Sequence, residues 1–222
     1  MIEIFELILN KILDAIYPPK CIFCGKENKD YICKVHLEEV EKLYNLKVIK
    51  RKDKVELISL FKYDNLIRNL LIDYKFNEKV YYYNSFIKFI INNQKLLYYL
   101  KTYDIIIPVP IHRKRMKERG YNQAGIIAKK LAKILNIDYI NLVQKNKNNK
   151  PQSSLDKQLR KTNVENVYGI NNKYKNVIIN NKKILIIDDI YTTGNTTNEI
   201  IKVITNNFNI DKNQIGIFVI AK

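Results

Sequence analysis

Tryptophan is absent from this 222-residue chain, and glycine and proline are scarce, at 6 and 5 residues. Lysine, asparagine and isoleucine are abundant instead, which is the bias that an AT-rich genome imposes on a protein. Glycines and arginines that are present against this background are therefore informative about local structure and function.

Long uncharged apolar runs are also missing from the sequence. No segment approaches the ~18 uncharged apolar residues that a membrane-spanning helix needs. Residues 1–16 are apolar but carry Glu3, Glu6 and Lys11 and have no small-residue cleavage site. They predict an amphipathic helix and not a signal peptide. We therefore expect a soluble, cytoplasmic protein with no membrane span.

Acidic residues are outnumbered, with 22 Asp and Glu against 39 Lys and Arg, a formal net charge of +17. A charge so far from neutral predicts anionic partners such as phosphates or nucleic acid. The genome bias explains the excess lysine equally well, because most charged residues simply face solvent. The charge alone therefore leaves both explanations open.

Hydrophobic residues make up 46% of the chain, and its length fits one domain with a small appendage. Short apolar runs alternate with segments of helical periodicity, without internal repeats. We expect strands at 55–63, 105–109, 139–143, 182–187 and 215–220. We expect helices at 37–46, 66–74, 86–100, 123–135 and 197–206, a charged linker at 47–54 and a long loop at 144–165. This alternation predicts an α/β fold with a parallel sheet.

All three cysteines lie close together near the N-terminus. Cys21, Cys24, Cys33 and His36 follow the spacing C-x2-C-x8-C-x2-H, in which each close pair directs two ligands at one tetrahedral ion. Gly25 follows the first pair, where a tight turn favours a residue that tolerates positive φ. A redox pair formed by Cys21 and Cys24 is the alternative, but it leaves Cys33 and His36 unexplained. The pattern predicts a structural zinc site.

The segment 184–196, ILIIDDIYTTGNT, joins four aliphatic residues to two adjacent acids and a hydroxyl-rich turn that enters a helix. Ligands of open parallel sheets bind at the carboxyl ends of the strands, where Asp188 and Asp189 are expected. The turn offers backbone N–H groups and hydroxyls to an anion at the positive end of a helix dipole. The two carboxylates suit ribose hydroxyls, directly or through Mg²⁺. A strand-to-helix turn capped only for structural reasons is the alternative.

A second cluster, 108–124, contains three of the chain's six arginines, Arg113, Arg115 and Arg119. Arginine binds phosphate in a bidentate manner, so its retention in a lysine-rich chain indicates phosphate contacts in a basic loop. A solvated helix start is the alternative. His112 fits a helix cap, a surface residue or a general acid or base.

The segment at 184–196 resembles the phosphoribosyl pyrophosphate (PRPP) motif of type I phosphoribosyltransferases. The resemblance implies that Asp188 and Asp189 hold the ribose hydroxyls. It assigns the 5′-phosphate to the following turn, at Thr192, Thr193, Gly194, Asn195 and Thr196. It also makes the two acids candidates for catalysis together with Arg113 and Arg119, and it adds Arg113 and Arg115 as PRPP contacts.

Together, the cysteine cluster, the arginine-rich stretch, the PRPP motif and the segment 61–76 resemble the ComF family of competence-associated proteins. A further matching pattern lies in the loop, at Gln152, Leu155, Arg160 and Asn163. The chain departs from the family's usual pattern at two places. His36 stands where relatives often have Cys, and Lys145, Lys147 and Asn149 stand where relatives often carry Arg and Thr.

This resemblance implies a type I phosphoribosyltransferase-like sheet, a zinc finger in 1–46, a hood or linker in 47–102 and the transferase-like core in 103–222. It further implies Mg²⁺ bound with PRPP, a role in natural transformation that involves single-stranded DNA, and partners among other competence proteins, helicase-like or DNA-processing. Tyr81–Tyr83, Tyr98 and Tyr99 either stack bases or belong to the core. A salvage or biosynthetic phosphoribosyltransferase and a non-enzymatic nucleic-acid-binding PRPP sensor are the alternative functions.

Overall fold

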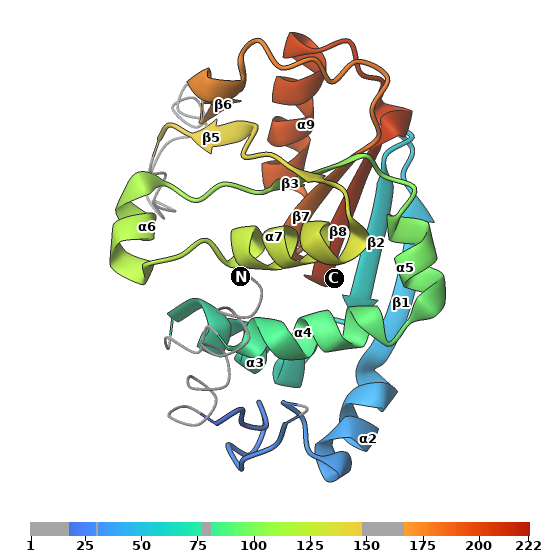
Figure 1. Cartoon of the computed structure of the whole chain (residues 1–222), viewed down its shortest axis with the longest axis vertical. Helices are drawn as coiled ribbons and strands as arrows, with labels where there is room; N and C mark the ends of the chain where they lie inside the picture. Colours follow the sequence, from blue (N-terminus) through green and yellow to red (C-terminus); the bar gives the residue numbers. More distant parts are fainter. Residues whose placement is uncertain (1–17, 30, 77–80, 148–166) are drawn as a thin grey trace, which may run out of the picture.

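The computed structural model describes residues 18–29, 31–76, 81–147 and 167–222. A six-stranded sheet in the order β1-β2-β8-β7-β3-β4 forms its centre (Figure 1). Only β1 runs antiparallel to its neighbour, and the other four pairings are parallel. The strands, in chain order, are β1 (Tyr44–Lys50), β2 (Glu56–Phe61), β3 (Ile105–Pro108), β4 (Asp138–Tyr139), β7 (Ile184–Ile190) and β8 (Ile215–Ala221). The predicted α/β fold with a mainly parallel sheet is therefore confirmed.

The helices pack around this sheet, and a short antiparallel hairpin stands apart from it. The α-helices are α2 (Lys34–Leu43), α3 (Asn65–Phe76), α4 (Tyr82–Ile91), α5 (Gln94–Leu100), α6 (Arg113–Arg119), α7 (Gln123–Leu135) and α9 (Asn195–Asn207). Two 3₁₀ turns cover Asn172–Tyr174 and Lys212–Gln214, and the hairpin pairs β5 (Val143–Lys145) with β6 (Tyr168–Ile170).

Both faces of the sheet are buried, which explains the continuous apolar runs of the central strands. Along β7, Leu185 and Ile187 join one apolar cluster, whereas Ile184 and Ile186 join the other. The first cluster contains residues of α3, α4 and α7, and the second contains the apolar face of α9. Figure 1 shows α9 and the α3–α4 pair at opposite ends of the view. The two faces of the central strands are thereby packed against helices. Their carboxyl ends are the part of the sheet where ligands of such folds bind.

Several predicted boundaries are wrong, and each has a local reason. The expected linker at 47–54 contains most of β1, an edge strand whose outward lysines hide its pattern. The expected helix at 86–100 is two helices, because the Asn93 side chain accepts a hydrogen bond from Leu96 N and starts α5. The expected strand at 139–143 divides between β4 and β5, and the basic loop after β3 is partly the helix α6.

Two regions of the sequence interpretation fall outside the described residues, namely the N-terminal helix at 1–16 and most of the loop at 144–165, with Asn149, Gln152, Leu155, Arg160 and Asn163. Residues 144 and 145 of that loop belong to β5. The division into 1–46, 47–102 and 103–222 stays a prediction, although β1 and β2 share one sheet with the later strands. None of the helices within the described ranges is long and apolar enough to cross a bilayer.

Candidate functional site

The four predicted zinc ligands lie together. The ligand atoms of Cys21, Cys24, Cys33 and His36 are all within 4.8 Å of one another. The Cys24 and Cys33 sulfurs are 4.0 Å apart, and sulfurs bound tetrahedrally to zinc at 2.3 Å lie about 3.8 Å apart. Cys33 precedes α2 and His36 lies in its first turn, so the helix fixes this half of the cluster. The donor set and its spacing fit a structural zinc ion.

Local structure prepares the other half of the cluster. Gly25 adopts φ +71°, and its N–H donates to the Cys21 carbonyl, which closes the tight turn that the sequence predicted. Burial raises the pKa of the Cys21 thiol, but backbone hydrogen bonds, first that of Cys24, outweigh it and lower the pKa to about 6. Phe23 stacks on the His36 ring at 5.2 Å. A thiolate held in this way is the form that binds zinc.

The two acids of the predicted PRPP motif lie near the end of β7, the central strand of the parallel part of the sheet. Asp188 Oδ1 accepts a hydrogen bond from Asp189 N at 2.9 Å. Asp189 is buried, and its carboxylate is 2.5 Å from the Lys75 ammonium at the end of α3. Burial, followed by the neighbouring charge of Asp189, raises the pKa of Asp188. Both acids line one cavity of about 320 Å³.

The hydroxyl-rich turn follows directly and leads into α9. Gly194 has φ +74°, and its carbonyl accepts hydrogen bonds from Thr197 Oγ1 and Asn198 N. Thr192 and Thr196 line the cavity, whereas Thr193, Gly194 and Asn195 lie in the same turn without lining it. An alanine Cβ at Gly194 would meet the Tyr191 hydroxyl at 2.3 Å. Both the positive φ and this close approach therefore require glycine.

The arginine-rich stretch divides between two cavities. Arg115 and Arg119 line the same cavity as the acids, whereas Arg113 lines a neighbouring one. Arg119 donates to Gln123 Oε1 at 3.3 Å, and burial, then the charge of Arg115, lowers its pKa. His112 Nδ1 accepts a hydrogen bond from Lys114 N at 3.2 Å. His112 therefore caps α6, which is one of the three roles that the sequence left open.

Two further cations, Lys75 and Lys145, line the cavity, and the sequence singled them out only as parts of the family resemblance. Lys75 is anchored by its neighbour Tyr74, whose hydroxyl donates to the Gln123 carbonyl and whose own carbonyl accepts from Tyr121. Lys145 comes from β5, where burial, followed by the charge of Arg115, lowers its pKa. Among the described residues, the cavity is thus lined by four cationic and two acidic side chains. It can accommodate a ligand with several negative charges.

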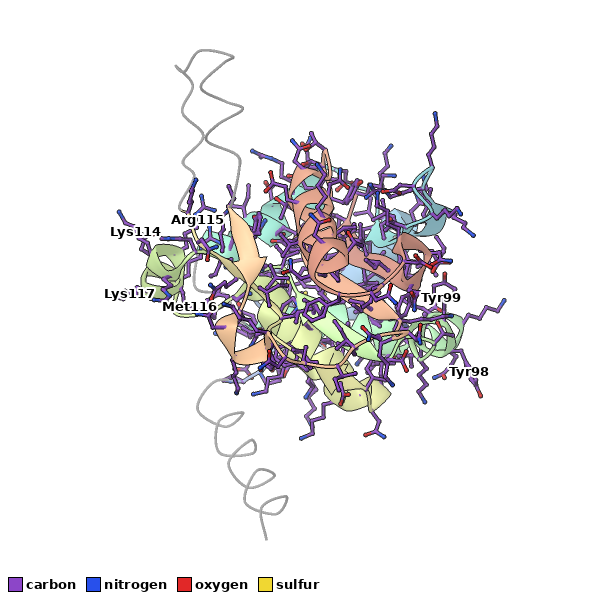
Figure 2. The ribbon with its side chains drawn as sticks, turned by 90° about the horizontal axis from the view of Figure 1, so that it is seen from above. Tyr98, Tyr99, Lys114, Arg115, Met116 and Lys117 are labelled. Atoms are coloured by element: carbon purple, nitrogen blue, oxygen red, sulfur yellow. The ribbon has the colours of Figure 1, made fainter. Side chains whose placement is uncertain are left out.

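None of the tyrosines considered for base stacking lines this cavity. Tyr82 is buried, and Tyr99 donates to Glu56 at 2.7 Å, so these two belong to the core and its edge. Tyr98 is 77% exposed. Figure 2 shows Tyr98 and Tyr99 on α5 at the opposite side of the molecule from Arg115 and Met116 on α6. Stacking by α5 would therefore take place far from the cavity.

No family model matches the chain. Curated relatives do match parts of it. Competence protein F of Haemophilus influenzae is 31% identical over 118 residues, which are 51% of this chain and 49% of that protein. Competence protein ComFC of Bacillus subtilis is 29% identical over 62% of this chain and 53% of its own length. DNA utilization protein YhgH of Escherichia coli K12 is 28% identical over 47% of this chain and 44% of its own.

These matches confirm the resemblance that the sequence motifs indicated. The chain spans about half the length of the curated relatives it matches.

Proposed function

We propose that this chain, a member of the ComF family, binds PRPP with Mg²⁺ in the cavity at the end of β7 and serves the uptake of DNA. One observation carries the proposal. A single cavity of about 320 Å³ joins adjacent carboxylates, a hydroxyl-rich turn at a helix start and cations from three other segments. The first two features suit a ribose 5-phosphate, and the cations suit a pyrophosphate group.

The residues would divide the ligand between them. The turn at 192–196 would hold the 5′-phosphate through backbone N–H groups, the threonine hydroxyls and the positive end of α9. Asp188 and Asp189 would hold the ribose hydroxyls. Arg115, Arg119 and Lys145 would flank the pyrophosphate from the other side. Carboxylates and PRPP oxygens are ligands that Mg²⁺ prefers, and the ion would offset the charge of the pyrophosphate.

The reaction that such a site supports is pentosyl transfer. A nucleophile would donate its electron pair to C1 of the ribose, while the C1–oxygen bond breaks and its electron pair leaves with pyrophosphate. The cations would stabilise the charge that develops on the leaving group, and positioning would be the main catalytic device. A nucleobase, an amine or a nucleic acid could each supply the nucleophile.

A role in DNA uptake rests on the names of the relatives, two of which are competence proteins and one a DNA utilization protein. The surface of α6 supports it, because Lys114 and Lys117 are exposed at the periphery of the molecule (Figure 2) on the same helix that contributes Arg115 and Arg119 to the cavity. Cations on an exposed helix suit the phosphates of single-stranded DNA. We propose that a zinc ion at the cysteine cluster has a structural role, because it would fix the segment whose Tyr31 carbonyl accepts a hydrogen bond from Ser85 of α4.

Calorimetric titration with PRPP and MgCl₂ tests the binding site. Asp188→Asn should abolish PRPP binding, whereas the matched control Asp138→Asn, at the exposed start of β4, should leave it unchanged. Wild-type protein that binds no PRPP, or an Asp188→Asn variant that binds it normally, would overturn the proposal. Pyrophosphate release assayed over bases, amines and single-stranded oligonucleotides then identifies the acceptor.

A further inference from the structure

A second cavity of about 580 Å³ lies beside the first and is the larger of the two. The two cavities share one wall, because the segment 110–112, Asn122 and Lys145 line both. The second cavity opens between α6 and the hairpin strand β5, which lie next to each other in Figure 1. Its volume is in the range of small-molecule sites. None of the PRPP contacts implied by the sequence except Arg113 lines it.

Carboxamides dominate the polar lining of this cavity and come from separate segments of the chain. Asn122 precedes α7, Asn141 and Gln144 lie at and before β5, and Asn171 follows β6. Asn122 Nδ2 donates to the Val109 carbonyl, and this leaves its buried Oδ1 without a partner among the described residues. Carboxamides both donate and accept hydrogen bonds, so they match ligands whose edges alternate donors and acceptors.

Apolar surface and positive charge complete the lining. Met116 contributes apolar surface, Tyr139 contributes an aromatic ring, and Arg113 and Lys145 contribute cationic groups. Among the described residues that line the cavity, none is acidic. A cationic ligand is therefore disfavoured, and an anionic ligand with a planar polar ring is favoured. Asparagine and glutamine pair with base edges, and aromatic rings stack on base faces.

We propose that this cavity binds a nucleoside monophosphate, with the heterocycle among the carboxamides and the phosphate beside Arg113, which lines only this cavity. The proposal goes beyond PRPP binding and does not require it. Because His112 lines both cavities, the nucleotide and a ligand of the first cavity would be neighbours. Each ligand should then change the affinity of the other by the same factor.

Calorimetric titration of the full chain with AMP, GMP, CMP and UMP tests the proposal, with inorganic phosphate as the comparison. At least one nucleotide should bind more tightly than phosphate, because the base contributes. Asn141→Asp and Met116→Glu should each weaken this binding about tenfold, since each places a negative charge in the lining. The matched controls are Asn206→Asp on α9 and Ile178→Glu, two exposed positions outside both cavities. Both controls should bind as wild type.

The Asp188→Asn variant separates the two sites. It should lose PRPP binding and keep nucleotide binding, because Asp188 lines only the first cavity. Absence of nucleotide binding in the millimolar range would overturn the second site. Binding that Asp188→Asn abolishes, and that Asn141→Asp and Met116→Glu leave unchanged, would also overturn it, because the nucleotide would then occupy the first cavity.

Discussion

The Lys75 ammonium lies 2.5 Å from the Asp189 carboxylate, so a residue at the end of α3 neutralises one of the two acids at the end of β7. Asp189 is 9% exposed at its side chain and Lys75 is 23% exposed. Two adjacent carboxylates would otherwise repel each other at a partly buried site. The pair therefore joins the end of α3 to the end of β7, which are far apart in the sequence.

Replacing Lys75 by methionine should destabilise the protein by about 3 kcal/mol in the absence of Mg²⁺, because it leaves a buried carboxylate uncompensated. Added Mg²⁺ should restore part of the loss if the ion binds at these acids. Urea unfolding with and without MgCl₂ measures both effects. Lys129→Met, on the exposed face of α7, is the control and should change little. Equal stability of the two variants would contradict this role of Lys75.

Gly194→Ala should destabilise the fold and prevent binding of ribose 5-phosphate. Gly120→Ala is a matched control, because Gly120 has φ +76° and open space around its Cβ position. The control should lose about 1 kcal/mol through backbone strain alone. Gly194→Ala should lose roughly 3 kcal/mol, because Tyr191 must also move away. Urea unfolding and calorimetry measure the difference, and similar losses in both variants would argue against the Tyr191 contact.

Arg51 should position the turn at 192–196, where we propose that the 5′-phosphate binds, from a distance. Its guanidinium donates to the Tyr191 hydroxyl at 3.1 Å and to Asn198 Oδ1 at 2.7 Å, and Tyr191 packs on Gly194. Arg51→Ala should weaken PRPP binding about tenfold, and Arg51→Lys should restore only part of the affinity, because lysine lacks the planar fork. Arg68→Ala, on the exposed side of α3, is the control. An affinity for PRPP that Arg51→Ala leaves unchanged in calorimetry would refute this positioning role of Arg51.

The cysteine cluster should hold one zinc ion per chain. Metal analysis after mild purification should find it in the wild type, and His36→Cys should retain it because four cysteines also bind zinc tetrahedrally. Cys24→Ser should lose the ion and lower the melting temperature, as a chelator should in the wild type. Wild-type protein that is purified without metal and keeps its stability in chelator would contradict the structural role.

Stability should fall as pH rises from 10 towards 12. Burial, followed by the hydrogen bond to Glu56, raises the pKa of Tyr99 to about 12, whereas unfolded tyrosine ionises near 10. The unfolded state therefore releases its proton first, and stability decreases with pH in this window. Urea unfolding at pH 9, 10 and 11 measures the slope, which should be shallower in Tyr99→Phe. An unchanged slope would show that Tyr99 does not contribute.

The parts of the fold and site that could be predicted have short-range signals. The consecutive apolar residues before Asp188 predict a strand, and the residues around Gly194 predict the turn that follows it. The predicted zinc ligands Cys21, Cys24, Cys33 and His36 have a spacing that by itself predicts that they lie together. These features agree with the described structure because local sequence determines them.

The parts that could not be predicted depend on contacts between distant residues. Lys75 reaches Asp189 across 114 positions of the chain, and Arg51 reaches Tyr191 across 140. The sequence around either cation contains no pattern that indicates its distant partner. Two weaker signals are present in the sequence. Lys75 lies beside Tyr74 in the segment 61–76, which resembles the ComF family, and Arg51 is one of only six arginines in the chain.

The position of β8 between β2 and β7 has a consequence for synthesis. Glu56 of β2 pairs with Gly216 of β8, 160 positions later in the chain, and β2 has no other neighbour on that side. Loop closure over such a distance is slow. During synthesis on the ribosome, the edge of β2 that pairs with β8 therefore stays unpaired until the other described strands have been made. An unpaired apolar edge of this kind favours aggregation during synthesis.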